Sequence, residues 1–486
     1  MKARSDTVLR ARSALFVAIF VLVWCLAGAE AYAQQLRFSL EHRDINPPDY
    51  ATFRVGPLYS HFSLSQEAGV RYTEGTLNTL ESIDGIQRGA FLTNGIDYPL
   101  ITSVSLHNYL MISKYMDLDM AIWARYEYYP LETQEDLFLM NLTDPQISSS
   151  FVWEFIPADN VRVKVYDRPA YLMEYVDQRG TSDLYGGEPF RRFQNDAGVD
   201  ADILLASDMN LALSLSRFDL LGASTNFTDQ ERTSYDERAA FEYQATPLLT
   251  VGVSADYAQS DYVVIRRSDF SSQTYSVFAG EELSPSSRVS ASIGYAIGET
   301  QTTSNSAVWI EQDAIVGSLS YENEIWKDIV CATSIAKQLR SGFNTSMEDI
   351  SSIKVGLRWN GSDWAANLSS GLDNVDVVNG GGGSYRDWRS DFGFSYPLAS
   401  DCTVSFSSSY LLRDDRSAAT LNTSNTPSEL VHDYSTWINR ISTAIAIMKD
   451  LNFGVYADYM IRDSSADVLR YDRFNVGAKL TYVYEY

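Results

Sequence analysis

The sequence predicts an all-β protein whose strands close into a single antiparallel transmembrane β-barrel. Apolar and polar residues alternate along many segments, these segments recur as hairpins with short turns, and the chain ends on a strand with an apolar face. Strict alternation places one set of side chains on each face of a strand, because successive Cβ atoms point to opposite sides.

The first residues are typical of a secretory signal peptide. Basic residues, including Lys2 and Arg12, precede an apolar run from Ala14 to Ala27, and Ala31-Tyr32-Ala33 gives a small-x-small cleavage pattern. This order of a basic region, a short apolar region and a small-residue site directs export. We therefore expect three segments: residues 1–33 as signal peptide, residues 34–57 as a periplasmic or lumen segment, and residues 58–486 as the transmembrane barrel.

The body of the chain repeats one unit, which is a strand, a tight polar turn and a second alternating strand. LASDMNLALSLS and AIMKDLNFGVYADY are two of nine such copies, and the stretches between copies are longer and rich in Ser, Asn, Asp, Thr and Gly. Outer-membrane barrels have short periplasmic turns, long outer loops and strands of about 10 residues. Nine hairpins, a strand leading in near 58–72 and a terminal strand predict roughly 20 strands, with a range of about 16 to 22.

The last thirteen residues, FNVGAKLTYVYEY, predict the strand that closes the barrel. In lipid every backbone hydrogen bond must be made within the protein, so the last strand has to pair with the first. An aromatic final residue also resembles the terminal signature that the barrel-assembly machinery reads in outer-membrane proteins. The residues assigned to the outward face of this closing strand are Phe474, Val476, Leu480, Tyr482, Tyr484 and Tyr486.

The residues opposite the apolar set predict a polar inner wall. Between Val289 and Ile297, for example, the inward positions are Ser, Gly and Ala, which are too small to fill the centre of a barrel of ~16 or more strands. We expect a water-filled lumen, in which rings of charge can set selectivity. The alternative is a solvated wall whose charges pair across strands. The inner wall is predicted to carry charges of both signs. The candidate lumen-lining cations are Arg125, Arg162, Lys164, Arg168, Lys354, Arg358, Arg389, Arg440 and Lys479, and the inward acids are Asp117, Asp119, Glu127, Asp256, Asp391 and Asp458.

Charge and motifs exclude several functions. The formal net charge of −25 argues against a nucleic-acid partner. We expect much of this negative charge in solvated outer loops such as Phe227–Glu237. The histidines lie in no hydrolase or metal-ligand motif, so we expect no enzyme activity, no metal and no cofactor. Cys331 and Cys402 are predicted to be free thiols, because about four strands separate them.

Aromatic residues near the predicted strand ends favour girdles at the two membrane interfaces, where a ring lies half in lipid. The residues assigned to these girdles include Tyr128, Tyr129, Trp359, Trp364, Trp388, Tyr396 and Tyr410.

The stretch FRVGPLYSHFSLSQEAGVRYTEG, followed by paired alternating strands to the end of the chain, resembles the beta-barrel porin 2 family of Gram-negative outer membranes. The compact part of this resemblance is Phe53-Arg54-Val55-Gly56-Pro57. Where that family continues with a Tyr-x-Asp-Asn type segment, this chain has Arg71-Tyr72-Thr73-Glu74. The resemblance implies an outer-membrane barrel, and some members of the group accompany exopolysaccharide-secretion systems.

Three functional hypotheses follow. The first is a porin-like diffusion channel for small hydrophilic solutes in the outer membrane of a Gram-negative bacterium, with outer-membrane lipid and the barrel-assembly machinery as partners. The second is a barrel of an exopolysaccharide secretion or surface-attachment system, with polysaccharide as a partner. The third is a secreted soluble all-β binding protein, which would need a packed core in place of a polar inner face.

Overall fold

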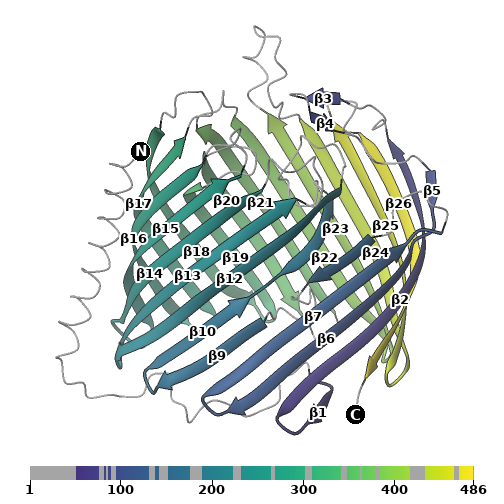
Figure 1. Cartoon of the computed structure of the whole chain (residues 1–486), viewed down its shortest axis with the longest axis horizontal. Helices are drawn as coiled ribbons and strands as arrows, with labels where there is room; N and C mark the ends of the chain where they lie inside the picture. Colours follow the sequence, from purple (N-terminus) through teal and green to yellow (C-terminus); the bar gives the residue numbers. More distant parts are fainter. Residues whose placement is uncertain are drawn as a thin grey trace.

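The computed structural model describes residues 51–484 apart from 76–80, 84–85, 89–94, 131–136, 142–150, 176–188, 223–230, 264–268, 302–308, 341–346, 362–363, 379–383, 416–432 and 465–469. The predicted signal peptide, residues 34–50 and Tyr486 lie outside the described residues. Of the expected periplasmic or lumen segment, residues 51–57 are described. They include β1 (Phe53–Val55), which forms a hairpin with β2 (Leu58–Gly75) at the end of the barrel where the C-terminus also lies (Figure 1).

The fold is a closed antiparallel barrel of 20 strands, as predicted. Two positions in the wall are each filled by two short strands, β8 with β9 and β10 with β11. The wall consists of β2, β6 (Leu100–Ser113), β7 (Met116–Tyr128), β8 (Leu137–Asn141), β9 (Phe151–Ala158), β10 (Val161–Asp167), β11 (Ala170–Tyr175), β12 (Pro189–Ala206), β13 (Met209–Gly222), β14 (Arg232–Gln244), β15 (Leu249–Tyr262), β16 (Phe270–Ser284), β17 (Ser287–Gln301), β18 (Trp309–Trp326), β19 (Ile329–Arg340), β20 (Met347–Asn360), β21 (Ala365–Val378), β22 (Ser384–Ala399), β23 (Cys402–Asp415), β24 (Tyr434–Met448), β25 (Leu451–Ser464) and β26 (Tyr471–Tyr484).

Three short strands complete the described part of the chain. β5 (Gly95–Asp97) extends the wall beside β2, and β3 (Glu81–Ile83) pairs with β4 (Ile86–Arg88) in a separate hairpin. All nine predicted hairpins are present, from β6–β7 to β24–β25, and their short turns lie at one end of the barrel (Figure 1).

The last strand closes the barrel against the first. β26 pairs with β2 from Phe62↔Tyr484 to Gly75↔Tyr471. Phe474, Val476, Leu480, Tyr482 and Tyr484 lie on one face of β26, and each exposes more than a third of its side chain. The ring of Phe53 packs edge-on against Tyr484, with 5.1 Å between ring centroids, so β1 covers the end of this closing strand.

Alternation divides the wall into an apolar outer face and a polar inner face. Ile293 and Ile315 are 61% and 68% exposed on the outer face, whereas Ala296 on the inner face is fully buried. One predicted girdle aromatic is on the wrong side, because the hydroxyl of buried Tyr129 accepts from Arg71 at 3.1 Å and donates to Glu127 at 2.7 Å. Tyr129 directly follows Tyr128, the last residue of β7. Beyond the end of a strand the alternation of faces no longer applies, so it did not predict the direction of the Tyr129 side chain. Tyr128, Trp388 and Tyr396 do face outward.

Cys331 and Cys402 are both free thiols, as predicted. Cys331 lies on β19 and Cys402 on β23, four strands further around the wall.

Candidate functional site in the barrel lumen

The inner wall is lined by small polar side chains that bond to one another across strands. Ser290 and Ser292 of β17 pair with Ser320 and Ser318 of β18, with 2.6 and 2.8 Å between hydroxyl oxygens. Ser254 of β15 makes the same contact with its neighbour on β16 at 2.8 Å. Short hydroxyl side chains do not reach the barrel axis, so the centre of a barrel of this size stays open.

Four of the nine predicted lumen cations are held in ion pairs. Arg125 lies 2.7 Å from Glu127, and Arg162 and Lys164 share Glu154 at 3.1 and 3.7 Å. Arg168 lies in the connection between β10 and β11 and reaches Asp196 of β12 at 3.4 Å. All four are on the side of the barrel formed by β7 to β12. The Arg125–Glu127 pair is spaced two residues apart on one strand, which was a signal visible in the sequence.

The other five predicted cations have no carboxylate within ion-pair distance in the part of the chain that the structure describes. We call them the cationic wall: Lys354 and Arg358 of β20, Arg389 of β22, Arg440 of β24 and Lys479 of β26. All five have inward parity, and all but half-buried Lys479 are exposed.

Strand register places these cations in rows. Lys354 is opposite Gly371 of β21, which is opposite Arg389, so a position without a side chain separates these two cations. Arg440 is supported by the ring of Tyr456, with its guanidinium carbon 5.0 Å from the ring centroid. The hydroxyl of Tyr456 donates to Glu67 of β2. Stacking leaves the edge of a guanidinium free to donate to a solute.

The other side of the lumen is acidic. β14 and β24 are the eighth and eighteenth of the 20 wall strands, so they stand opposite each other. The inward acids on β12 to β15 are called the acidic wall: Asp200, Asp202, Asp236, Glu242 and Asp256. Asp256 pairs with Arg238 at 3.5 Å and Asp200 accepts from Ser214 at 2.6 Å. Asp202 and Glu242 have no cationic partner among the described residues.

Sequence reasoning assigned Asp256 to the inner face but missed the rest of the acidic wall. The stretch Phe227–Glu237 was expected to be a solvated outer loop, yet β14 begins at Arg232 and Asp236 faces the lumen. The charged and hydroxyl residues at the start of β14 resemble those of a solvated loop, so the strand was not predicted there. The signal that could have found it is the alternation of Tyr235, Ala239 and Phe241, which lie on the outer face of the same strand.

The ends of β19 and β20 that lie away from the short turns fold into the lumen. Leu339 and Met347 are 8% and 0% exposed, and they form a cluster with Phe270, Ala296 and Val316 on the inner face of β16, β17 and β18. A Cβ atom on Gly298 of β17 would lie 2.6 Å from the sulfur of Met347 and 2.7 Å from Leu339 Cδ2. The absence of a side chain at Gly298 therefore makes room for this overlap, which narrows the lumen at the acidic wall.

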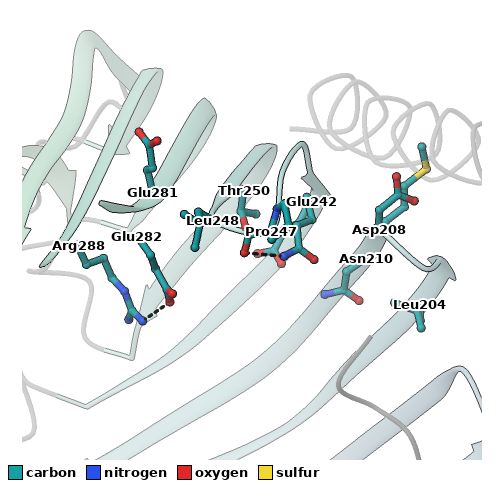
Figure 2. Close-up of a pocket in the computed structure, with 13 residues that line it drawn as sticks. Leu204, Asp208, Asn210, Glu242, Pro247, Leu248, Thr250, Glu281, Glu282 and Arg288 are labelled. Carbon is teal, nitrogen blue, oxygen red and sulfur yellow. Dashed lines mark hydrogen bonds and ion pairs between the residues drawn. The ribbon is translucent and has the colours of Figure 1, made fainter. Parts of the chain in front are cut away.

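Two cavities follow the inner side of β12 to β17. One of about 330 Å³ lies beneath the overlap and is lined by Asp236, Arg238, Asp256, Thr274 and Leu339, among others. A second, of about 490 Å³, lies at the end with the short turns (Figure 2). Its lining carries Asp208, Glu242, Glu281 and Glu282, and Arg288 pairs with Glu282 at 2.8 Å.

The described residues contain no group of three or more His, Cys, Asp and Glu side chains arranged to hold a metal ion. His107 is fully buried and lies 2.5 Å from Asp119, a contact between β6 and β7. Among the residues that the structure describes, no helix is both long and apolar enough to cross a membrane.

Comparison with known proteins identifies similar structures but no similar sequence. No protein-family model matches the chain, and no curated protein matches it. Among solved structures, the FrpB iron transporter from Neisseria meningitidis (F5-1 variant, apoprotein form) has a TM-score of 0.48 at 9% identity over 87% of this chain and 81% of that one. The copper transporter OprC has a TM-score of 0.48 at 9% identity, over 89% and 81%. The outer membrane protein OpdK from Pseudomonas aeruginosa has a TM-score of 0.39 at 10% identity, over 87% and 99%.

Proposed function

We propose that the chain forms a porin-like diffusion channel for small hydrophilic solutes in a Gram-negative outer membrane. The observation that carries this proposal is the set of five inward cations that have no carboxylate within ion-pair distance among the described residues, on the side of the lumen opposite the acidic wall. Exposed ion pairs contribute only about 0 to 1 kcal/mol to stability, so the fold does not depend on pairing these cations. Charges left free toward water are available to passing solutes.

The two charged walls favour solutes that carry charge or a strong dipole. An anion or an anionic sugar would pass along the cationic wall, where Arg389 and Arg440 offer several N–H donors each. A cation or ammonium group would pass along the acidic wall. Because the walls face each other, a dipolar solute would be oriented as it crosses the narrow part of the lumen.

The rest of the proposal follows from the sequence. The signal peptide accounts for export, the apolar outer face for insertion into lipid, and the terminal strand for recognition by the barrel-assembly machinery. The sequence contains no hydrolase motif such as HExxH or GxSxG, which favours a protein without enzyme activity. The resemblance to the beta-barrel porin 2 family agrees with this proposal. Membership of the chain in that family is part of what we propose.

The test is ion conductance of the purified, refolded protein in a planar bilayer, with a salt gradient to measure selectivity. Stable open steps are expected. A correctly folded barrel that stays silent would contradict the channel and favour the second hypothesis, a barrel for exopolysaccharide secretion or surface attachment. Fractionation is the prior control, since a barrel stays with the outer membrane after a high-salt wash.

A further inference from the structure

The barrel wall has a seam between β18 and β19 in the half that lies away from the short turns. The two strands pair from Trp326↔Ile329 to Gly317↔Lys337, and their pairing ends there. Above that point residues 309–316 of β18 pair with β17 alone, and residues 338–340 of β19 pair with β20 alone. Among the described residues, no strand pairs with the other edge of β18 from Ile310 to Val316.

The residues that leave this edge carry side chains suited to the outer face. On β19, Ile335 is 55% exposed and faces outward, and Leu339 has the same parity. Met347 of β20 likewise has the parity of Ile353, which is 50% exposed. Instead of contacting lipid, Leu339 and Met347 pack on the inner face of β16 to β18. The overlap thus takes two outward-patterned residues into the lumen.

Continuing the existing register gives a second arrangement of the same residues. Gly317 opposite Lys337 would bring Val316 opposite Gln338, Ile315 opposite Leu339, and Ala314 opposite Arg340. Leu339 would then lie beside Ile315, the most exposed outward isoleucine of the wall at 68%. The overlapped arrangement buries apolar side chains, whereas the extended one pairs residues 314–316 of β18 along an edge where the described chain otherwise places no strand.

The ends of β19 and β20 are tied to each other, so they would move together. Lys337 lies 3.1 Å from Asp349, and Arg340 lies 3.4 Å from Glu348. Both ion pairs cross between the two strands and are independent of β18. The hydroxyl of Tyr385 on β22 donates to Glu348 at 3.3 Å, which connects this unit to the cationic side of the wall.

We propose that the β18–β19 seam is a gate with two arrangements. In the overlapped arrangement the ends of β19 and β20 narrow the lumen. In the extended arrangement residues 338–340 pair with residues 314–316 of β18, and the lumen is wider. The proposal rests on the channel function, because it assigns the regulation of that channel to one pair of strands.

Disulfide trapping tests the gate in a background in which Cys331 and Cys402 are replaced by serine. Gly298→Cys with Met347→Cys should lock the overlap, and Ile315→Cys with Leu339→Cys can bond only in the extended arrangement. Cross-links are scored on gels of oxidised outer membranes, and conductance is measured before and after reduction. We expect both to form, the first suppressing large open steps and the second giving a larger unit conductance that returns to the wild-type value on reduction.

The control for cross-strand bonding is Leu319→Cys with Ile335→Cys, a pair on the same two strands and the same face below the seam. If this control bonds and the 315–339 pair never does, while the protein still conducts, the gate is refuted and the channel stands. If wild type and all variants are silent, the channel function fails and the gate with it.

A substitution without cysteine gives a second measurement. Gly298→Val would place methyl groups against Met347 and Leu339 and should displace the overlap, which raises the fraction of large open steps. Gly280→Val is the matched control, because Gly280 is also an inward glycine and a Cβ there would meet its nearest atoms at 4.0 Å. Equal conductance histograms for the two variants would refute the gate.

Discussion

Reversing the charge of Arg389 should shift the selectivity of the channel toward cations. Arg389 is exposed on the inner face of β22, and no carboxylate among the described residues lies within ion-pair distance of it. Arg386 is the matched control, because it lies three residues away on the outward face of the same strand, where it donates to Asn374 at 2.9 Å. Arg389→Glu and Arg386→Glu change the net charge equally but place the change on opposite faces of the strand.

The size of the shift follows from Coulomb's law. A unit charge about 7 Å from an ion in water contributes about 0.6 kcal/mol, so reversing it changes the energy of the ion by about 1.2 kcal/mol. At about 0.1 M salt the Debye length of about 10 Å reduces this to roughly 0.6 kcal/mol. This energy lowers the concentration of anions near the site about 2.8-fold and raises that of cations about 2.8-fold. The cation-to-anion permeability ratio therefore rises about eightfold.

The assay is the reversal potential under a KCl gradient in a planar bilayer. We expect Arg389→Glu to move it toward the cation limit and Arg386→Glu to leave it at the wild-type value. In about 1 M salt the Debye length falls to about 3 Å, so most of the effect should disappear. A reversal potential for Arg389→Glu that equals that of Arg386→Glu at low salt would refute the assignment of the cationic wall.

Three further predictions concern assembly and stability. Tyr484→Asp places a charge on the lipid face of the closing strand and should abolish insertion, whereas inward Lys479→Asp should insert normally, as scored by outer-membrane fractionation. Arg413→Ala should lower the free energy of unfolding by about 3 to 5 kcal/mol in a urea titration. The buried guanidinium of Arg413 lies 2.5 Å from the carboxylate of Asp387 on β22, which would lose its partner. A loss below about 1 kcal/mol would show that this pair contributes no more than an exposed surface pair. Cys331 and Cys402 of the unfolded mature protein should react with maleimide without prior reduction, and labelling that needs a reductant would contradict the free thiols.

The architecture could be predicted because its signals are local. Alternation at period two depends only on neighbouring residues, and a short turn between two alternating runs defines a hairpin without knowledge of the rest of the chain. For this reason all nine hairpins, the closing role of the strand ending near Tyr484 and the strand count were accessible. Errors occurred where the local signal was weak, as at the charged start of β14 and at Tyr129 just beyond the end of β7.

The sequence predicted the charged residues of the lumen only in part. Alternation placed the nine cations on one face, but it could not say which of them meet a carboxylate. Arg168 finds Asp196 because β12 lies beside the connection between β10 and β11, and Arg389 finds none because Gly371 and Leu411 stand opposite it. These outcomes depend on the register between strands, and a register shift of one residue would exchange the two faces.

The sequence by itself determined that this chain is a closed barrel with an apolar outer face and a polar lumen, since a repeating two-residue pattern has one way to satisfy both lipid and backbone hydrogen bonds. The tertiary structure alone decided how the lumen is shaped. Leu339 and Met347 carry an outward pattern and yet lie inside, because Gly298 leaves space on the inner wall for the apolar cluster that receives them. Packing between strands distant in the chain decided that position, and no local pattern encodes it.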